Sequence, residues 1–462
     1  DVANAAAQSG LKVAIVEKGM MGGTCLNRGC IPSKLLIHSA NVADTIRHAR
    51  TFGINVDNFS IDFEKIVKRV NNITDTESEA IKNSYQKLGN PKFFPKECKF
   101  LADKKISFVN GETTTTITAD KILIASGTKP KIPEIKGLQG SGFITSDEAL
   151  RLKQQPSILT FIGGGYITCE LAHFYGSLGT KINIVQLGDK LIPNEDKDIS
   201  QKFTEVFSRR YNVYLGYSIE SVTKKKEKEK NSTNKNFGSE IFHITAKNDT
   251  SGKSLELNSD QLLLAIGRIP NSHSLDIEKT GVKLDQKGFI IVDEYLETHI
   301  KGIFALGDVV GRYQFKHNAN HEAQYAYHNI LNSDRKIPVE YYAMPHAIFS
   351  SPQVAGVGFT EQQLEEEDKK EGKDYLKCIY PYIQTAMGKA LEDRDGFVKF
   401  LVNREDRKVL GCHIIGTDAS TLIHEVLVTM KAGDGTIDSI RKTIHIHPAL
   451  SEVIAGAAGA ID

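Results

Sequence analysis

The sequence lacks tryptophan, a marked net charge and any long hydrophobic run. Lysine and arginine together number 58 and aspartate and glutamate 57, so the net charge of +1 provides no broad positive field that would attract nucleic acid. No apolar stretch approaches the ~18 residues that span a bilayer, and the first residues do not form a secretory signal. These absences predict a cytoplasmic protein whose partners include neither nucleic acid nor a membrane.

Cysteine is also scarce, with 6 residues in a chain of 462. This number is too small for a disulfide scaffold, and a closely spaced pair in a reducing compartment more often serves redox chemistry or metal binding. Cys25 and Cys30 form such a pair. The other cysteines lie in apolar settings, where we expect buried and unreactive thiols: Cys98, Cys169, Cys378 and Cys412.

The length and the remaining composition indicate an ordinary globular protein of several domains. At about 150 residues per domain the chain holds roughly three. Apolar residues make up 40% and charged residues 25%, as in soluble globular proteins. The charged run at residues 223–230 is expected to be a solvated loop, because the alternative of a nucleic-acid patch lacks interleaved aromatic residues. Residues 365–373 are expected to be a similar surface run.

An internal repeat organises the first part of the chain. Residues 10–17 and 179–186 each place a glycine, typical of a helix end, before a short β-branched strand, at an offset of 179 − 10 = 169. Residues 122–127 and 262–267 are apolar strands that end at glycine, at an offset of 267 − 127 = 140. Two matched pairs in the same order favour two similar nucleotide-binding domains of α/β type over a chance resemblance of apolar strands.

The second copy carries a complete phosphate-binding turn. A strand over residues 158–162 leads into Gly163 and Gly165, a helix follows through residue 172, and the polar Gln186 ends the next strand 186 − 163 = 23 residues later. Glycines let the backbone approach a pyrophosphate at a helix N-terminus. The corresponding glycines of the first copy would precede residue 1, so we expect the first dinucleotide fold without its opening strand and phosphate loop.

From about residue 340 the pattern changes. Strand-like segments occur at residues 343–348, 396–402 and 409–415, with one long helix at residues 420–433. This pattern predicts a third domain of α+β type. The predicted fold class is therefore α/β, with two dinucleotide-binding, Rossmann-like domains and a C-terminal α+β domain.

The most informative string runs from Gly22 to Lys34 and contains the cysteine pair. Two cysteines five residues apart resemble half of a zinc site, but no second Cys or Cys/His pair accompanies them, so we predict a redox-active disulfide and no metal. Pro32 is tolerated in the first turn of a helix and so places Cys30 at a helix N-terminus, where the dipole favours a thiolate. Lys34 adds positive charge one turn further.

Four motifs, in this order, resemble those of the class I pyridine nucleotide–disulfide oxidoreductases, which are flavin-dependent enzymes. They are the cysteine string, Gly-Gly-Gly-Tyr-Ile-Thr-Cys-Glu at 163–170, Ala-Leu-Gly-Asp at 305–308 and His-Ile-His-Pro-Ala-Leu-Ser-Glu at 445–452. The resemblance covers essentially the whole chain and is strongest to the dihydrolipoamide dehydrogenases. It implies an NAD domain inserted in an FAD domain, followed by a dimerisation domain. The implied boundaries are 1–150 and 271–339 for the FAD domain, 151–270 for the NAD domain and 340–462 for the dimerisation domain.

The resemblance also implies the cofactor contacts. Glu17 would bind the ribose of FAD, Asp308 would hold the ribityl chain, and Gln186 would bind the ribose of NAD. The set implied for FAD is Glu17, Thr24, Lys34, Gly127, Asp308 and Ala319. The set implied for NAD is Gly163, Gly165, Tyr166, Ile167, Glu170, Gln186 and Gly267. Because Gln186 has no charge to repel the 2′-phosphate of NADP, we expect only a weak preference for NAD, and NADP stays an alternative.

The roles at the redox centre are implied in the same way. Cys25 would be the exposed sulfur that exchanges with substrate, and Cys30 would face the flavin as the charge-transfer thiol. Lys34, paired with Glu170, would support catalysis beside the flavin ring.

His447 from the neighbouring subunit would be the catalytic base, with Glu452 as its orienter. The residues agree with this role, because Pro448 can open a helix with His447 at its start and Glu452 near its second turn. A purely structural histidine is the alternative for His447. His445 has the same alternative and no support from the motif.

The implied activity is the oxidation of protein-bound dihydrolipoamide by NAD in a homodimer, through FAD and the Cys25–Cys30 disulfide. Residues 313–322 look more like those of mycothione reductases, so an NAD(P)H-dependent reductase of a small disulfide is an alternative. An alternative of another class is a non-catalytic nucleotide-binding or assembly subunit. An enzyme is favoured, because such a subunit has no physical reason to keep both cysteines together with His447 and Glu452.

Overall fold

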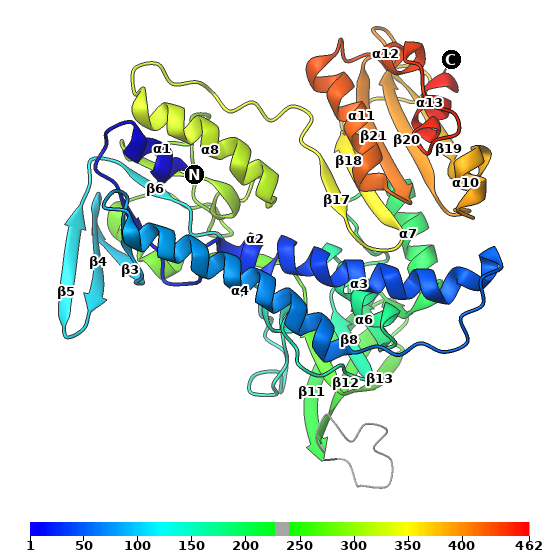
Figure 1. Cartoon of the computed structure of the whole chain (residues 1–462), viewed down its shortest axis with the longest axis horizontal. Coiled ribbons are helices and arrows are strands. Elements are labelled where there is room, and N and C mark those ends of the chain that lie inside the picture. Colours follow the sequence, from blue (N-terminus) through cyan, green and yellow to red (C-terminus); the bar gives the residue numbers. More distant parts are fainter. Residues whose placement is uncertain (227–239, 462) are drawn as a thin grey trace. The chain divides into compact units, whose positions relative to one another are not determined.

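The computed structural model describes residues 1–226 and 240–461 (Figure 1). The chain divides into two compact units, each built from three separate stretches of sequence. The first unit comprises Asp1–Leu35, Lys65–Ile132 and Gly267–Glu340. The second unit comprises Leu36–Glu64, Pro133–Ile266 and Tyr341–Asp462. In the part of the chain that the structure describes, no helix is both long and apolar enough to cross a bilayer.

The first unit contains two pairs of parallel strands and an antiparallel sheet. β1 (Ala14–Val16) pairs with β2 (Lys92–Phe94), and β6 (Ile122–Ile124) pairs with β16 (Ile303–Ala305). The antiparallel sheet consists of β3 (Cys98–Ala102), β4 (Lys105–Asn110) and β5 (Thr113–Thr118). The helices that fall wholly or partly in this unit are α1 (Val2–Gln8), α2 (Gly23–Arg28), α3 (Cys30–His48), α4 (Phe63–Lys87) and α8 (Lys316–Leu331).

The second unit contains the predicted nucleotide-binding copy as a four-stranded parallel sheet. Its strands, in spatial order, are β10 (Asn212–Leu215), β9 (Lys181–Gln186), β8 (Ile158–Ile162) and β14 (Gln261–Leu264). Its longer helices are α6 (Tyr166–Ser177) and α7 (Lys197–Arg210). The strand predicted at residues 158–162 coincides with β8, and Leu159 and Phe161 on it are fully buried, as expected of a central parallel strand.

The internal repeat is visible in the backbone at four glycines. Gly10 and Gly179 precede the matched strands β1 and β9 and have φ angles of +87° and +105°. Gly127 and Gly267 follow β6 and β14 and have φ angles of +66° and +117°. Such left-handed conformations favour glycine because it has no Cβ. The two copies therefore share their chain reversals as well as their strands.

Residues from 341 onward form the predicted α+β domain. Its antiparallel sheet has the spatial order β17 (His346–Ile348), β18 (Gln353–Gly358), β21 (Val409–Gly416), β20 (Phe397–Asn403) and β19 (Tyr375–Pro381). Three helices of the domain contribute to its core, namely α11 (Ala419–Ala432), α12 (Ile437–Lys442) and α13 (Glu452–Gly459). Shorter helices of the chain are α5 (Ser146–Ala149), α9 (Glu361–Glu366) and α10 (Ala386–Ala390). Val398, Ile423 and Ile454 meet in one buried core, so sheet and helices pack together.

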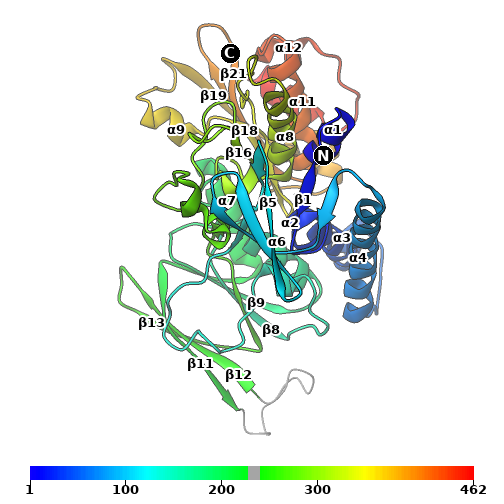
Figure 2. The same cartoon turned by 90° about the vertical axis from the view of Figure 1, so that its left-hand side faces the viewer.

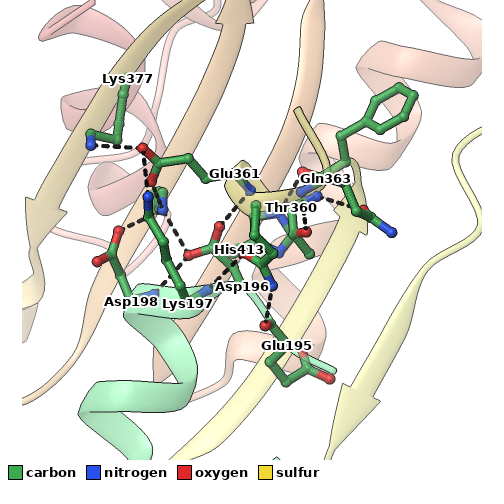
Figure 3. A network of polar contacts seen from close by, with 12 residues as sticks. Glu195, Asp196, Lys197, Asp198, Thr360, Glu361, Gln363, Lys377 and His413 are labelled. Atoms are coloured by element: carbon green, nitrogen blue, oxygen red, sulfur yellow. Dashed lines mark hydrogen bonds and ion pairs between the residues drawn. The ribbon is translucent and has the colours of Figure 1, made fainter. Parts of the chain in front are cut away.

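A buried ion network joins this sheet to α7 within the second unit (Figure 3). Lys399 on β20 has no exposed surface, and its Nζ contacts the carboxylates of Asp196, Asp198 and Glu361. Burial alone would raise the pKa of Glu361, but its bonds with Lys399 and Lys377 lower that pKa to about 2. Charges this deep in a protein persist only when they are paired.

One of the two charged runs is not the loop that we expected. Residues 223–226 belong to β11 (Tyr217–Lys226), because they continue a ladder of cross-strand hydrogen bonds. The sheet is completed by β12 (Glu240–Asn248) and β13 (Ser254–Ser259), as Figure 2 shows. The rest of that run, residues 227–230, lies outside the described residues. The second run, residues 365–373, is exposed throughout, as predicted.

Candidate active site

The cysteine pair spans the junction of two helices in the first unit. Cys25 lies inside α2, Gly29 separates the helices, and Cys30 is the first residue of α3. The predicted helix start at Cys30 is therefore confirmed. Backbone N–H groups near a helix N-terminus stabilise a thiolate, and this position gives Cys30 that environment.

The two thiols are in direct contact. A hydrogen bond with Cys30 is the largest cause that raises the pKa of Cys25, burial adds to it, and the positive charge of Lys316 acts in the opposite direction. Neighbouring thiols lose their protons in sequence, because a second thiolate would form beside the first. Such a contact is also what a reversible disulfide between the two residues requires.

The exposure of the two cysteines is the reverse of what we expected. Cys30 is exposed and Cys25 is half-buried. The reason is their place in the helices: Cys25 lies inside α2 next to Leu26 and Asn27, which are buried, whereas Cys30 is the first residue of α3. In the polypeptide alone, Cys25 is therefore not the more exposed sulfur.

The other four cysteines meet the prediction of buried thiols only in part. Cys169 and Cys412 are buried, but Cys98 on β3 and Cys378 on β19 are half-buried, because alternate residues of a strand face outward. Burial raises the pKa of all four thiols, which are thus poor nucleophiles. Residues 1–226 and 240–461 contain no group of three His, Cys, Asp or Glu side chains placed to hold a metal ion.

Lys34 and Glu170 fall in different units. The Nζ of Lys34 lies 3.4 Å from the Oγ of Ser33, one turn after Cys30. Glu170 on α6 is buried and accepts a hydrogen bond of 3.0 Å from the backbone N–H of Phe349. Their pairing stays a prediction.

Asp308 is the best-defined of the residues predicted to bind FAD. It accepts a hydrogen bond of 3.1 Å from the Oγ1 of Thr128. Burial raises the pKa of Asp308, while the bond from Thr128 and the charge of Arg268 lower it. The carboxylate is therefore held in a partly buried polar setting, where it can accept a further hydrogen bond from a ligand hydroxyl.

The neighbouring turn also fits a bound cofactor. Among the residues that the structure describes, the buried Oγ of Ser126 has no hydrogen-bond partner, and no atom lies within 4 Å of the position that a Cβ on Gly127 would take. Glu17 at the end of β1 accepts a hydrogen bond of 2.6 Å from the N–H of Gly19. An orphaned hydroxyl beside an open glycine indicates that something other than this chain completes the site.

Thr24 and Ala319 also belong to the first unit. Thr24 is exposed on α2, and Ala319 lies in the first turn of α8. The Cβ of Ala319 stands 3.4 Å from the position that a Cβ on Gly307 would occupy, so α8 packs closely on the segment that carries Asp308.

The glycine turn of the second unit has the geometry that nucleotide binding requires. A Cβ on Gly163 would lie 2.4 Å from the backbone oxygen of Ala265, whereas a Cβ on Gly165 would meet no atom of residues 1–226 and 240–461 within 4 Å. Thr168 closes the turn by donating a 2.8 Å hydrogen bond to the oxygen of Gly163. Helix α6 begins at Tyr166, so the open side of the turn lies at a helix N-terminus, where phosphate binds favourably.

The remaining residues predicted for NAD are divided between the units. Ile167 lies in the first turn of α6, and Gln186 at the end of β9 donates a hydrogen bond of 3.3 Å to the oxygen of Lys190. Gly267 belongs to the first unit, where its oxygen accepts a hydrogen bond from the N–H of Lys131. The contact of Gly267 with NAD stays a prediction.

His447 and Glu452 meet as the motif predicts, but not on one helix. The Nδ1 of His447 lies 2.8 Å from the Oε1 of Glu452, and this hydrogen bond is the largest cause that lowers the pKa of Glu452. Helix α13 begins at Glu452 rather than at Pro448, because the intervening residues form a turn in which Ala449 donates to the Glu452 carboxylate. The ring of His447 stays 74% exposed. The ring of His447 is therefore oriented by Glu452 and accessible.

His445 differs from His447 in its surroundings. Its Nε2 lies 2.6 Å from the Oε1 of Glu425 on α11, and only 11% of its side chain is exposed. It is thus a satisfied structural histidine. Ile444 and Ile446 on either side are exposed by 96% and 76%.

Two basic residues near these sites were missed by the sequence analysis. Lys316 begins α8 and places its charge near Cys25. Arg268 hydrogen-bonds to Thr128, the partner of Asp308. Lys316 could have been noticed, because it falls in the segment that differs from the dihydrolipoamide dehydrogenases. Arg268 could not, because its partner Thr128 is 140 positions away and no local pattern in the sequence marks the contact.

The architecture and this site together define a flavoprotein disulfide oxidoreductase. The chain belongs to the pyridine nucleotide-disulphide oxidoreductase family, whose model matches residues 1–323, and the dimerisation domain of that family matches residues 344–458. Enzymes of this family depend on FAD and use NAD(P)H as the pyridine nucleotide.

Among its relatives, the chain is 33% identical to a dihydrolipoyl dehydrogenase of Geobacillus stearothermophilus over 455 residues, which cover 98% of this chain and 92% of that protein. It is equally 33% identical to a mycothione reductase of Mycobacterium tuberculosis (strain ATCC 25618 / H37Rv) over 459 residues, with coverage of 96% and 94%. Among solved structures, it is similar to the Cu(II) complex of the HOCl-induced flavoprotein disulfide reductase RclA from Escherichia coli. That similarity has a TM-score of 0.84 at 25% identity and covers 99% of this chain and 96% of the other.

Proposed function

We propose that the protein is a dithiol–disulfide oxidoreductase that oxidises protein-bound dihydrolipoamide with NAD through FAD. The contact between Cys25 and Cys30 at the start of α3 carries this proposal. A dithiol at a helix N-terminus can exchange with a substrate dithiol and hold the resulting thiolate. The similarity to dihydrolipoyl dehydrogenases over nearly the whole chain supports this substrate.

In the proposed reaction, His447 takes the proton from one thiol of the substrate while Glu452 fixes its ring through Nδ1. The substrate thiolate attacks the Sγ of Cys25 in the oxidised pair, the bond between the cysteines breaks, and Cys30 leaves as a thiolate. The second substrate thiol then attacks the mixed disulfide and passes its proton to Cys25, which releases the oxidised lipoyl group. When bound, FAD supplies the transfer of the electron pair from the dithiol to the nicotinamide.

We propose the following residues as the cofactor contacts. For FAD they are Glu17, Thr24, Lys34, Gly127, Asp308 and Ala319, supported by the orphaned Ser126 hydroxyl and the half-buried Asp308 carboxylate. For NAD they are Gly163, Gly165, Tyr166, Ile167, Glu170, Gln186 and Gly267, supported by the open turn at Gly165. Lys34 and Glu170 are proposed to pair beside the flavin.

We further propose a homodimer in the cytoplasm. The match to a dimerisation domain supports the dimer, and the role of His447 in a partner's site requires it. A thiol-dependent reaction suits a reducing compartment. The domain boundaries at residues 150, 270 and 339 belong to the same proposal.

A reductase of a small disulfide of the mycothione type is the second candidate. One observation favours it: Lys316, in the segment that departs from the dihydrolipoamide dehydrogenases, brings positive charge to the exchanging sulfur. The equal identity to a mycothione reductase agrees with it. Membership of an enzyme family and the paired thiols both favour either candidate over a non-catalytic subunit.

Turnover of lipoamide and of low-molecular-weight disulfides, each measured with NADH and NADPH, tests the proposal. We expect the highest kcat/KM with lipoamide and NADH. A kcat/KM for a small thiol disulfide that exceeds that for lipoamide would establish the second candidate. A reductive titration continued past two electrons per FAD adds a check on both, because only an enzyme with an active thiol pair takes up electrons beyond the two of its flavin.

A further inference from the structure

Two segments that the repeat relates are fastened to one another in the first unit. β7 (Thr128–Pro130) pairs in antiparallel fashion with β15 (Arg268–Pro270). Asn271 adds two hydrogen bonds to the turn before β7. Its Nδ2 donates to the backbone oxygen of Ser126 at 2.8 Å, and its backbone N–H donates to the backbone oxygen of Gly127 at 3.0 Å. The strand pairing and Asn271 therefore both hold the backbone around Gly127.

The side chain of Arg268 also hydrogen-bonds to Thr128, which in turn hydrogen-bonds to Asp308. Its Nε donates to the Oγ1 of Thr128 at 2.8 Å, and its Nη2 donates to the Thr128 oxygen at 2.9 Å. The same Oγ1 donates to the Oδ2 of Asp308 at 3.1 Å. A guanidinium can only donate, so it occupies a lone pair of the hydroxyl and leaves the single hydroxyl proton for Asp308. Arg268 thus fixes the direction in which Thr128 donates.

The charges around Asp308 make this connection matter. Asp308 lies in a short 3-10 helix (Gly307–Val309), and the charge that lowers its pKa is that of Arg268 on β15. The neighbouring elements carry other charged side chains, namely Lys129 on β7 and Lys316 and Glu322 on α8. Glu322 is buried and is already engaged by the N–H of Gly307 at 2.6 Å and by Asn318. Arg268 therefore provides the positive charge that opposes the effect of burial on Asp308.

We infer that Arg268 is a positioning residue for flavin binding, which acts through Thr128 to keep Asp308 an oriented, ionised acceptor for a hydroxyl of the FAD ribityl chain. The inference rests on the proposed placement of FAD at Asp308. It goes beyond that placement because it gives Arg268 on β15 a role in orienting the carboxylate of Asp308, about 40 positions further along the chain.

The affinity for FAD, measured by flavin fluorescence between pH 5 and 8, tests the inference. Loss of Arg268 raises the pKa of Asp308, so the carboxyl is protonated at a higher pH and stops accepting. We expect Arg268→Met to shift the pH at which FAD affinity falls upward by about one unit, which is roughly ten-fold weaker binding near pH 5 and a smaller loss at pH 8. Arg268→Lys, which keeps the charge but not the fork, should recover part of the shift, and Thr128→Val should reproduce it.

Asn271→Ala is the matched control. It removes a bond from the same turn but leaves Arg268, Thr128 and Asp308 in contact, so any loss of affinity should be equal at all pH values. An equal, pH-independent loss in Arg268→Met would show that Arg268 is merely structural and would overturn the inference. Asp308→Asn separates this failure from a failure of the proposed FAD site: an unchanged FAD affinity in that variant would place the flavin elsewhere, whatever Arg268 does.

Discussion

Cys25 and Cys30 are chemically alike but differ in position, one inside α2 and the other at the first residue of α3. Cys25→Ser leaves Cys30 at the helix N-terminus, so the charge-transfer absorbance between its thiolate and the flavin should persist while lipoamide turnover is lost. Cys30→Ser should lose both. The measurement is the visible absorbance of each variant with its thiols reduced and its flavin oxidised. Cys378→Ser, at a half-buried cysteine, is a control that keeps both signals. Loss of the band in Cys25→Ser and its retention in Cys30→Ser would reverse the two roles.

Gln186 is the residue at which the choice of pyridine nucleotide can be tested. Its side chain lies at the end of β9, held by the oxygen of Lys190, and carries no charge. Gln186→Glu adds a carboxylate that accepts from the ribose hydroxyls of NAD and repels the phosphate of NADP, so the preference for NAD should rise by about ten-fold. The ratio of kcat/KM for NADH and NADPH measures it. Asp189→Asn on the following loop should leave that ratio nearly unchanged. A wild-type protein that strongly prefers NADPH would contradict the local argument.

At the scale of the element, the turn between β8 and α6 contains two glycines with different expected roles: Gly163 is needed for folding and Gly165 for nucleotide binding. Gly163→Ala forces a Cβ to 2.4 Å from a backbone oxygen at a φ of +106°, so we expect a loss of stability of about 1–3 kcal/mol. The Cβ of Gly165→Ala meets no atom of the described residues within 4 Å, and the φ of −82° is ordinary, so Tm should not change. Its Cβ enters the space proposed for the pyrophosphate, and the Kd for NADH should rise about ten-fold or more. Thermal unfolding and NADH titration of both variants decide it. Wild-type NADH affinity in Gly165→Ala would place the phosphate elsewhere.

Elements with a strong local signal could be predicted, and contacts between distant segments could not. β8 follows from its apolar run, and the start of α3 at Cys30 follows from Pro32. The same proline argument fails at Pro448, because Ala449 and its neighbours use the Glu452 carboxylate in a turn before the helix begins. Proline permits a helix start but does not require one.

The candidate site divides in the same manner. The bond between His447 and Glu452 joins residues five apart and was visible as a motif. The path from Arg268 through Thr128 to Asp308 joins three segments that only the fold brings together, so no spacing could reveal it. The exposure of Cys25 and Cys30 likewise depends on which helix face packs inward.

On the scale of whole units, the network around Lys399 couples stability to pH. The pKa of Glu361 lies at about 2 in the folded protein against an ordinary value of 4.5, so its contribution is fully present above pH 4.5 and is lost as the pH falls toward 2. Glu361→Gln should lower the free energy of unfolding by roughly 3 kcal/mol at pH 7, because Lys399 loses a buried partner. The deficit should shrink as the pH falls from 4.5 toward 2. Chemical denaturation at a series of pH values is the measurement.

Glu365→Gln is the matched control for this network. Glu365 lies on the same helix and pairs with Lys197, but it is exposed, so its removal should change stability by well under 1 kcal/mol at any of these pH values. A constant deficit in Glu361→Gln across the range would show that lost packing, and not the ion network, accounts for its effect.

In the proposed homodimer, each site takes its cysteines from one subunit and His447 from the other. His447→Gln should slow thiol exchange by roughly 10²–10⁴-fold. His445→Gln is the control, because His445 is already engaged by Glu425 and should not affect exchange. Chains with Cys25→Ser and chains with His447→Gln are each inactive, but a mixed dimer contains one site with both residues intact. After proven subunit exchange we expect up to about one quarter of wild-type activity, since half of the randomly formed dimers carry one working site of two. Complete absence of recovery would mean that His447 serves the cysteines of its own chain or serves none.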